Sequence, residues 1–145
     1  MAILANILAA EDDEIETLGE SLDPLAEWSG VALPDLDTAK IAMLHSLLTA
    51  DLFTDALARY EPVYVSAEGA LLLRLADELS ERLAQLEEEL LEPIAAELAA
   101  TEEFESAQWE DGAIAAMLHE LVELARLAQA QDQALFVWMQ RLRSS

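Results

Sequence analysis

The stretch Ala134-Leu135-Phe136-Val137-Trp138-Met139 places six apolar residues in a row between polar neighbours. A short apolar run with such boundaries is typical of a strand that is buried on both faces of a sheet. Two other segments favour short strands: residues 3–8, which are apolar apart from Asn6, and residues 63–65, which read Val-Tyr-Val. The sequence therefore predicts a small sheet of about three short strands, near residues 3–8, 63–65 and 134–139.

Most of the remaining chain has the apolar spacing of amphipathic helices. Asp35 or Asp37 is a suitable N-cap for a helix that places Ile41 and Leu44 on one face. Residues 112–131 have the same spacing over a longer distance and predict the last long helix.

A central helix is predicted to begin at Ser66, which is a favourable N-cap. Its apolar stripe would consist of Leu72, Leu75, Ala76, Leu79, Leu83, Leu86 and Leu90. Pro93 predicts a break near residues 91–92, because proline kinks or ends a helix. The expected fold class is therefore α/β and mostly helical, with about six helices around the small sheet, in a single acidic globular domain over residues 1–145.

The composition combines strong acidity with high hydrophobicity. The chain has 145 residues, of which 30 are acidic and 7 basic, and its net charge is -23. Hydrophobic residues make up 54%, so we expect a folded core, because disorder requires low hydrophobicity as well as charge. The absence of cysteine excludes disulfides and thiolate metal sites. No apolar run approaches the roughly 20 residues of a membrane helix, and the first residues lack the basic start of a secretory signal, so we expect a cytoplasmic protein.

The negative charge indicates which partners the protein can meet. It repels nucleic-acid phosphates and anionic lipids and attracts basic surfaces, so we expect no nucleic acid and no membrane as a partner. The sequence also contains neither a Gly-x-Ser-x-Gly motif nor a glycine-rich phosphate loop. These observations predict a non-enzymatic binding protein without a cofactor, namely an immunity protein that neutralises a basic toxin by covering its active cleft. The residues expected to face this partner are Trp28, Glu87, Glu88, Glu102, Glu103, Glu105, Trp109, Glu110 and Asp111.

Other interpretations of the same features remain open. The acidity could be an adaptation to high salt, and the protein could be a structural module that exists as a monomer or a weak homodimer. His119 and Glu123 lie four residues apart on a predicted helix and could share a metal ion. Two ligands make a poor site, however, so we predict no metal centre.

The order of the predicted elements resembles the YfbM-like family, also called DUF1877, a domain of unknown function. The resemblance covers nearly the whole chain. It rests on the first 15 residues, on Leu44-His45-Ser46-Leu47-Leu48-Thr49, on Val63-Tyr64-Val65-Ser66-Ala67-Glu68, and on the helix, polar turn and strand of residues 121–139. The chain departs from the family pattern at Ile41, where a tryptophan is usual, at Ala50, where a glycine is usual, and at residues 105–106, where Tyr-Pro is usual.

The resemblance implies an α/β fold with few strands. It also supplies an alternative function, because the Leu-His-x-x-Leu-Thr match implies a pocket around His45. In this alternative the protein is a small enzyme or a ligand-binding domain. The pocket would be formed by His45, Thr49 and Tyr64, with Asp37 or Asp51 as the carboxylate.

Overall fold

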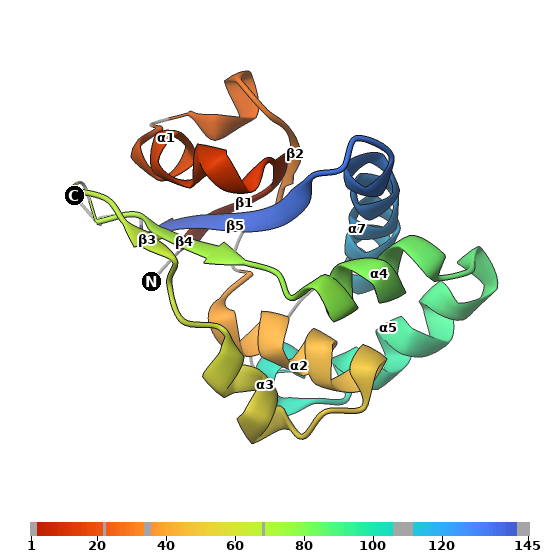
Figure 1. Ribbon diagram of the computed structural model, residues 1–145. Coiled ribbons are helices and arrows are strands. Elements are labelled where there is room, and N and C mark those ends of the chain that lie inside the picture. Colours follow the sequence, from red (N-terminus) through yellow and green to blue (C-terminus); the bar gives the residue numbers. More distant parts are fainter. Residues whose placement is uncertain (1–2, 22, 34–35, 68, 106–111, 142–145) are drawn as a thin grey trace.

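A five-stranded antiparallel sheet forms the centre of the protein (Figure 1). The computed structural model describes residues 3–21, 23–33, 36–67, 69–105 and 112–141. The strands follow the order β2-β1-β5-β4-β3 across the sheet. Their bounds are β1 (Ile3–Ala10), β2 (Ser29–Ala32), β3 (Tyr64–Val65), β4 (Leu71–Arg74) and β5 (Ala134–Arg141).

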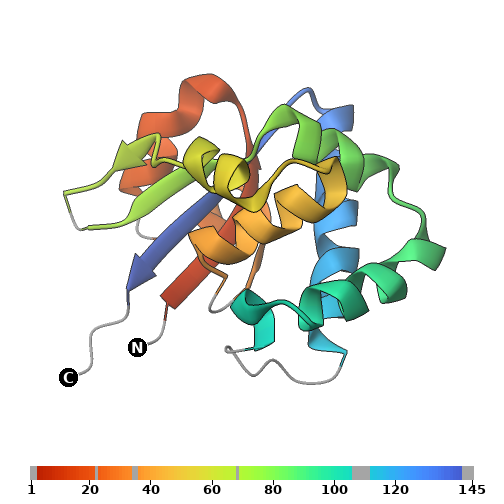
Figure 2. The same cartoon turned by 90° about the horizontal axis from the view of Figure 1, so that it is seen from below.

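The strand β5, which contains the apolar run of residues 134–139, lies in the middle of the sheet. It pairs with β1 from Ile3↔Arg141 to Ala10↔Ala134, and with β4 on its other side. Figure 2 shows β1 and β5 running side by side along their length. Trp138 and Val137 are 1% and 0% exposed, so both faces of this strand are buried, as its unbroken apolar run predicts.

The expected mostly helical α/β class is confirmed, but the sheet is larger than predicted. Strands were expected near residues 3–8, 63–65 and 134–139, and the structure has β1, β3 and β5 there. The predicted number of about three strands is too low, because the sheet also contains β2 and β4. Ser29 and Gly30 begin β2, where Gly30 lies against the backbone of Ile7.

The predicted central helix from Ser66 to about residue 90 is wrong outside residues 77–85. The break expected near residues 91–92 lies earlier, at residues 86–87, and Pro93 is in the first turn of a helix that begins at Leu91, where proline is tolerated. Ser66 begins a tight turn, in which its hydroxyl accepts a hydrogen bond from the Ala70 amide, and β4 follows directly. The helix α4 (Asp77–Gln85) starts only after this strand. Leu72 and Leu73 face opposite sides of the sheet and are both buried, so the run of leucines reflects a two-sided strand and not a helix stripe.

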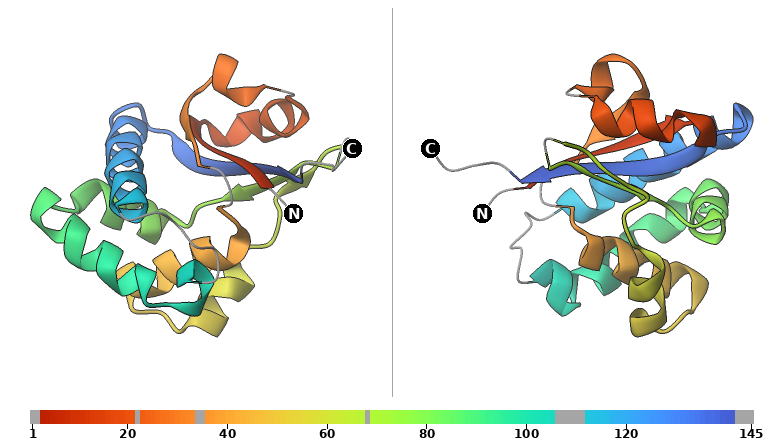
Figure 3. Two further views of the ribbon diagram at one scale, coloured as in Figure 1. Left: turned by 180° about the vertical axis from the view of Figure 1, so that it is seen from behind. Right: turned by 60° about the vertical axis from the view of Figure 1, so that its left-hand side comes forward.

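Helices cover both faces of the sheet (Figure 3). One face carries α1 (Ile15–Glu20) and the short 3₁₀ helices η1 (Asp12–Glu14) and η2 (Pro24–Ala26). The opposite face carries α7 (Ala113–Ala130) and α4, followed by α2 (Thr38–Thr49), α3 (Phe53–Arg59), η3 (Glu88–Leu90), α5 (Leu91–Ala99) and α6 (Glu102–Glu105). No helix within the described ranges is both long and apolar enough to cross a bilayer.

The alternation of side chains along the strands divides the core into two clusters. Leu8, Phe136 and Trp138 pack on the α1 side of the sheet. Ile7, Leu135 and Val137 pack on the side of α7, α4 and α2, which holds the larger cluster. The larger cluster brings α2, α3 and α4 together at one end, and this junction contains the most connected group of polar side chains in the described residues.

Candidate functional site

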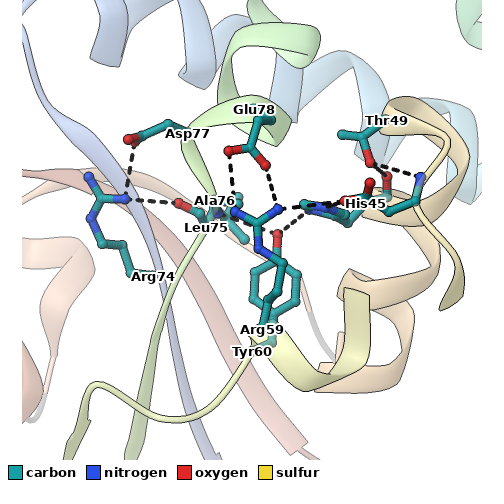
Figure 4. Close-up of polar contacts among 10 residues, drawn as sticks. His45, Thr49, Arg59, Tyr60, Arg74, Leu75, Ala76, Asp77 and Glu78 are labelled. Atoms are coloured by element: carbon teal, nitrogen blue, oxygen red, sulfur yellow. Dashed lines mark hydrogen bonds and ion pairs between the residues drawn. The ribbon is translucent and has the colours of Figure 1, made fainter. Parts of the chain in front are cut away.

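His45 occupies the centre of this junction, although its ring is completely buried. It lies on α2, and its side chain has 0% exposure. The Nδ1 atom lies 2.7 Å from the Tyr60 hydroxyl, and the Nε2 atom lies 2.8 Å from Oδ2 of Asp51 (Figure 4). Both ring nitrogens are therefore used within the protein, which removes the cost of burying an unsatisfied polar ring.

The end of α2 determines how Asp51 reaches the histidine. Ala50 adopts a left-handed conformation with φ of 67°, which ends the helix and turns the chain back. The Thr49 hydroxyl donates to the His45 carbonyl at 2.7 Å, and the Ser46 hydroxyl donates to the Asp51 carbonyl at 2.6 Å. These bonds hold the Asp51 side chain beside the Nε2 atom of His45.

Arg59 joins this pair to a second carboxylate. It ends α3, and its guanidinium donates two hydrogen bonds to Glu78 in the first turn of α4. Its Nη1 atom also lies 3.6 Å from Oδ2 of Asp51. Figure 4 shows the guanidinium directly below the Glu78 carboxylate, with which it makes its hydrogen bonds. We call His45, Asp51, Arg59, Tyr60 and Glu78 the His45 cluster.

The electrostatics of the cluster favour charged carboxylates and a neutral tyrosine. The hydrogen bond from His45 lowers the pKa of Asp51, and the Arg59 charge lowers it further. The hydrogen bonds from Arg59 lower the pKa of Glu78. Burial raises the pKa of Tyr60 to about 12. The cluster therefore contains two negative charges and one permanent positive charge at neutral pH.

One assignment of hydrogen-bond donors and acceptors gives the buried polar atoms of Tyr60 and His45 a partner each. The Ala76 amide donates to the Tyr60 oxygen at 3.3 Å. The Tyr60 hydroxyl can then donate to Nδ1 of His45, and the Nε2 proton of His45 is donated to Asp51. This assignment makes the imidazole neutral and connects a backbone amide of the core to a carboxylate at the surface.

The structure brings together only part of the pocket expected around His45. His45 and Thr49 are neighbours on α2, but Tyr64 lies on β3 and packs on the α1 side of the sheet beside Gly19. The alternation of side chains on the strand turns Tyr64 away from His45, so these three residues do not line one pocket. Of the two carboxylates considered, Asp51 reaches His45, whereas Asp37 caps α2 and pairs with Lys40.

The residues expected to face a partner lie in different parts of the protein. Trp28 is partly buried, and its indole nitrogen donates to Glu14 at 3.1 Å. Glu87 and Glu88 are exposed at η3, and Glu102 is exposed at the start of α6. Glu103 and Glu105 belong to the backbone of α6, but their side chains lie outside the description. Trp109, Glu110 and Asp111 lie outside the described residues.

The segment that contains α5 has many acidic side chains and no lysine or arginine to pair with them. The sequence from residue 83 to residue 125 contains no lysine and no arginine. Of its carboxylates, those of Glu87, Glu88, Glu89 and Glu92 are exposed, and none of these four is in an ion pair within the described residues. Leu90 lies among them and is 47% exposed. We call these five residues the α5 acidic surface.

Three basic residues elsewhere, Lys40, Arg59 and Arg74, are already paired with carboxylates. Lys40 pairs with Asp37, and Arg74 pairs with Asp12 and Asp77. His119 and Glu123, the pair that sequence spacing identified, lie 3.2 Å apart on α7 and are both more than half exposed. They form an exposed pair on one helix, and no third acidic or histidine side chain of the described residues completes a metal-binding group with them.

The fold and these sites define an acidic α/β protein, in which one antiparallel sheet carries a helical layer with a buried histidine cluster and an unpaired acidic surface. No protein-family model and no characterised protein matches the chain. Among solved structures, the chain is similar to the crystal structure of YfbM from Escherichia coli, a protein of unknown function. The two share 16% sequence identity with a TM-score of 0.48, over 94% of this chain and 99% of that chain.

Proposed function

We propose that the protein is an acidic inhibitor that binds a basic protein, in the manner of an immunity protein that covers the active cleft of a toxin. The α5 acidic surface is the site at which we expect this partner to bind. A basic enzyme that acts on nucleic acid presents a positive cleft, and a set of carboxylates that covers the cleft excludes the substrate.

The absence of compensating cations around α5 carries this proposal. Elsewhere in the described residues, Lys40, Arg59 and Arg74 each contact at least one carboxylate. Arg126, the first cation after residue 82, donates to the backbone carbonyls of Ala84 and Leu86 and leaves the glutamates of the α5 acidic surface unpaired. Unpaired surface charge increases the rate at which an oppositely charged protein associates.

Leu90 offers an apolar contact to the partner, which the glutamates of the α5 acidic surface do not. Interfaces derive most of their affinity from a few apolar or aromatic side chains surrounded by polar residues. Leu90 lies between Glu89 and Glu92 in the sequence, so an exposed leucine is flanked by exposed glutamates. We expect the glutamates to govern the rate of association and Leu90 to govern the rate of dissociation.

A panel of basic toxin domains, nucleases among them, tests the proposal by stopped-flow binding at low and high salt. We expect one member to bind, with an association rate that falls as salt screens the charges. The variant E87Q/E88Q/E89Q/E92Q should slow association by about tenfold or more. Leu90→Ser should instead accelerate dissociation.

The matched control is E16Q/E61Q/E81Q/E120Q, which removes the same number of charges from exposed positions outside the α5 acidic surface. We expect this control to associate nearly as fast as the wild type. Failure of every basic protein to bind at low salt would contradict the proposal. Equal slowing by the two fourfold variants would show that net charge acts without a defined surface.

A further inference from the structure

We propose that His45, Asp51 and Glu78 form a binding site for a divalent transition-metal ion, for which Zn²⁺ is the best match, and that Arg59 competes with the metal for this site. One ligand atom from each of the three residues lies within 4.8 Å of the other two. These residues come from α2, from the turn that follows it and from α4, so the fold and not a local sequence motif brings them together.

The donor set suits zinc better than the alkaline-earth ions. Zinc binds both imidazole nitrogen and carboxylate oxygen, whereas Mg²⁺ and Ca²⁺ prefer oxygen ligands alone. The Nε2 atom of His45 is only 2.8 Å from Oδ2 of Asp51, so small side-chain movements would let both atoms reach one ion. Three protein ligands leave a fourth tetrahedral position for water.

The surroundings of His45 resemble the outer shell of a metal ligand. A ligating histidine almost always has a hydrogen-bond partner on its other ring nitrogen, which fixes the ring. The Tyr60 hydroxyl takes this role at 2.7 Å from Nδ1, and the Ala76 amide in turn fixes the hydroxyl. The ring is also completely buried, so its orientation is set before any ion binds.

Arg59 holds the position of a cation between the two carboxylates. Its guanidinium contacts both Asp51 and Glu78, and its side chain is 42% exposed. It can therefore swing into solvent without disturbing the core. A metal ion that replaces it brings a charge of +2 in place of +1 to two carboxylates, and the proton on Nε2 moves to Nδ1, so that the imidazole stays neutral.

A second acidic group lacks these features. Glu11, Asp13 and Glu14 also place their oxygens within reach of one another, but none of the three is buried and no histidine accompanies them. This group serves as a control for diffuse attraction of cations by the charge of -23.

Titration with Zn²⁺ by calorimetry, and with Co²⁺ by visible absorption, tests the proposal at high salt. We expect the wild type to bind one ion at the site and to show the absorption of a tetrahedral Co²⁺ centre. Glu78→Gln should weaken binding by about tenfold or more, because it removes a ligand. Arg59→Gln should strengthen binding by about tenfold, because it removes the competing cation.

The two variants also separate metal binding from a purely structural role. Both break the contact between Arg59 and Glu78, so a change in stability alone would move them in the same direction. Opposite changes in zinc affinity support the site. Equal affinities for the wild type and both variants, or a loss of binding in Asp13→Asn or His119→Asn, would overturn the proposal.

Discussion

The His45 cluster shows what a single buried histidine requires. His45 has no exposed surface, and each ring nitrogen has one partner. Removal of either partner would leave a buried polar atom unsatisfied, which costs about 1–3 kcal/mol. The cluster therefore fixes the positions of α2, α3 and α4 relative to one another, whatever its chemical role.

Tyr60 makes the stability of the protein sensitive to alkaline pH. Its pKa is about 12 in the folded protein, whereas an unfolded tyrosine has a pKa near 10. The folded state thus holds the proton more tightly, so the stabilisation is complete below pH 10 and is lost as the pH rises towards 12. We expect urea unfolding to show a loss of about 2–3 kcal/mol over this interval.

The variant Tyr60→Phe should remove most of this alkaline loss and should be less stable at neutral pH, because His45 loses a hydrogen-bond partner. Tyr64→Phe is the control, because Tyr64 lies on the other side of the sheet and has no contact with His45. A wild-type stability that does not change between pH 9 and 11 would contradict this prediction.

At the scale of the elements, the sequence correctly predicts a helix or strand when its residue pattern is compatible with only one kind of secondary structure. The capping of α2 by Asp37 and the extent of α7 follow from local signals. The strand β4 does not, because Leu72, Leu75 and Leu79 have helical spacing by coincidence while Leu71–Arg74 pairs with β5. Partners that lie far away in the sequence overrode the local pattern.

The same limit applies to the candidate site. His45 and Asp51 are only six residues apart, so both could be identified as candidates from the sequence. Tyr60 and Glu78 were missed, because 15 residues separate Tyr60 from His45 and 19 separate Glu78 from Arg59, across turns that no motif specifies. The acidic stretch after Arg82 was readable from the sequence, and the structure adds that the glutamates around Leu90 are exposed.

Arg126 connects α7 to the end of α4, which lies about 40 residues earlier in the sequence. From α7 it donates to the carbonyls of Ala84 and Leu86 at 3.0 and 2.8 Å, where α4 ends. A cation at this position satisfies free carbonyls and interacts favourably with the helix dipole. We expect Arg126→Gln to lower the free energy of unfolding by about 1–3 kcal/mol, as measured by urea denaturation.

Arg82→Gln provides the comparison, because Arg82 is exposed and makes no hydrogen bond or ion pair within the described residues. We expect this change to alter stability by less than about 0.5 kcal/mol. If both variants lose the same stability, net charge and not the contact with the end of α4 determines the effect.

At the scale of the whole molecule, positive charge is distributed unevenly. Four of the seven basic residues, Lys40, Arg59, Arg74 and Arg82, precede residue 83, and none lies between residues 83 and 125. The helices η3 and α5 therefore repel one another's glutamates without a compensating cation. A protein that keeps such a region tolerates a cost in stability, which a basic partner would relieve on binding.

Salt should consequently stabilise the protein. We expect the urea midpoint to rise with added NaCl, because screening reduces the repulsion among carboxylates. The variant E87Q/E88Q/E89Q/E92Q should show a smaller rise and a higher midpoint at low salt. A midpoint that does not respond to salt would contradict this prediction. A chain that folds only in molar salt would favour adaptation to brine as the reason for the acidity.

The place of β5 in the sheet also dictates when the protein can fold during translation. The strand pair β1–β2 does not contact the strand pair β3–β4 through hydrogen bonds in the sheet. Instead β5 lies between them and pairs with β1 on one side and β4 on the other. A growing chain therefore holds two separate strand pairs, with the central position of the sheet empty, until β5 is available to join them. Until then the free edges of β1 and β4 are open to pairing with other chains, so this stage of folding is the one most exposed to aggregation.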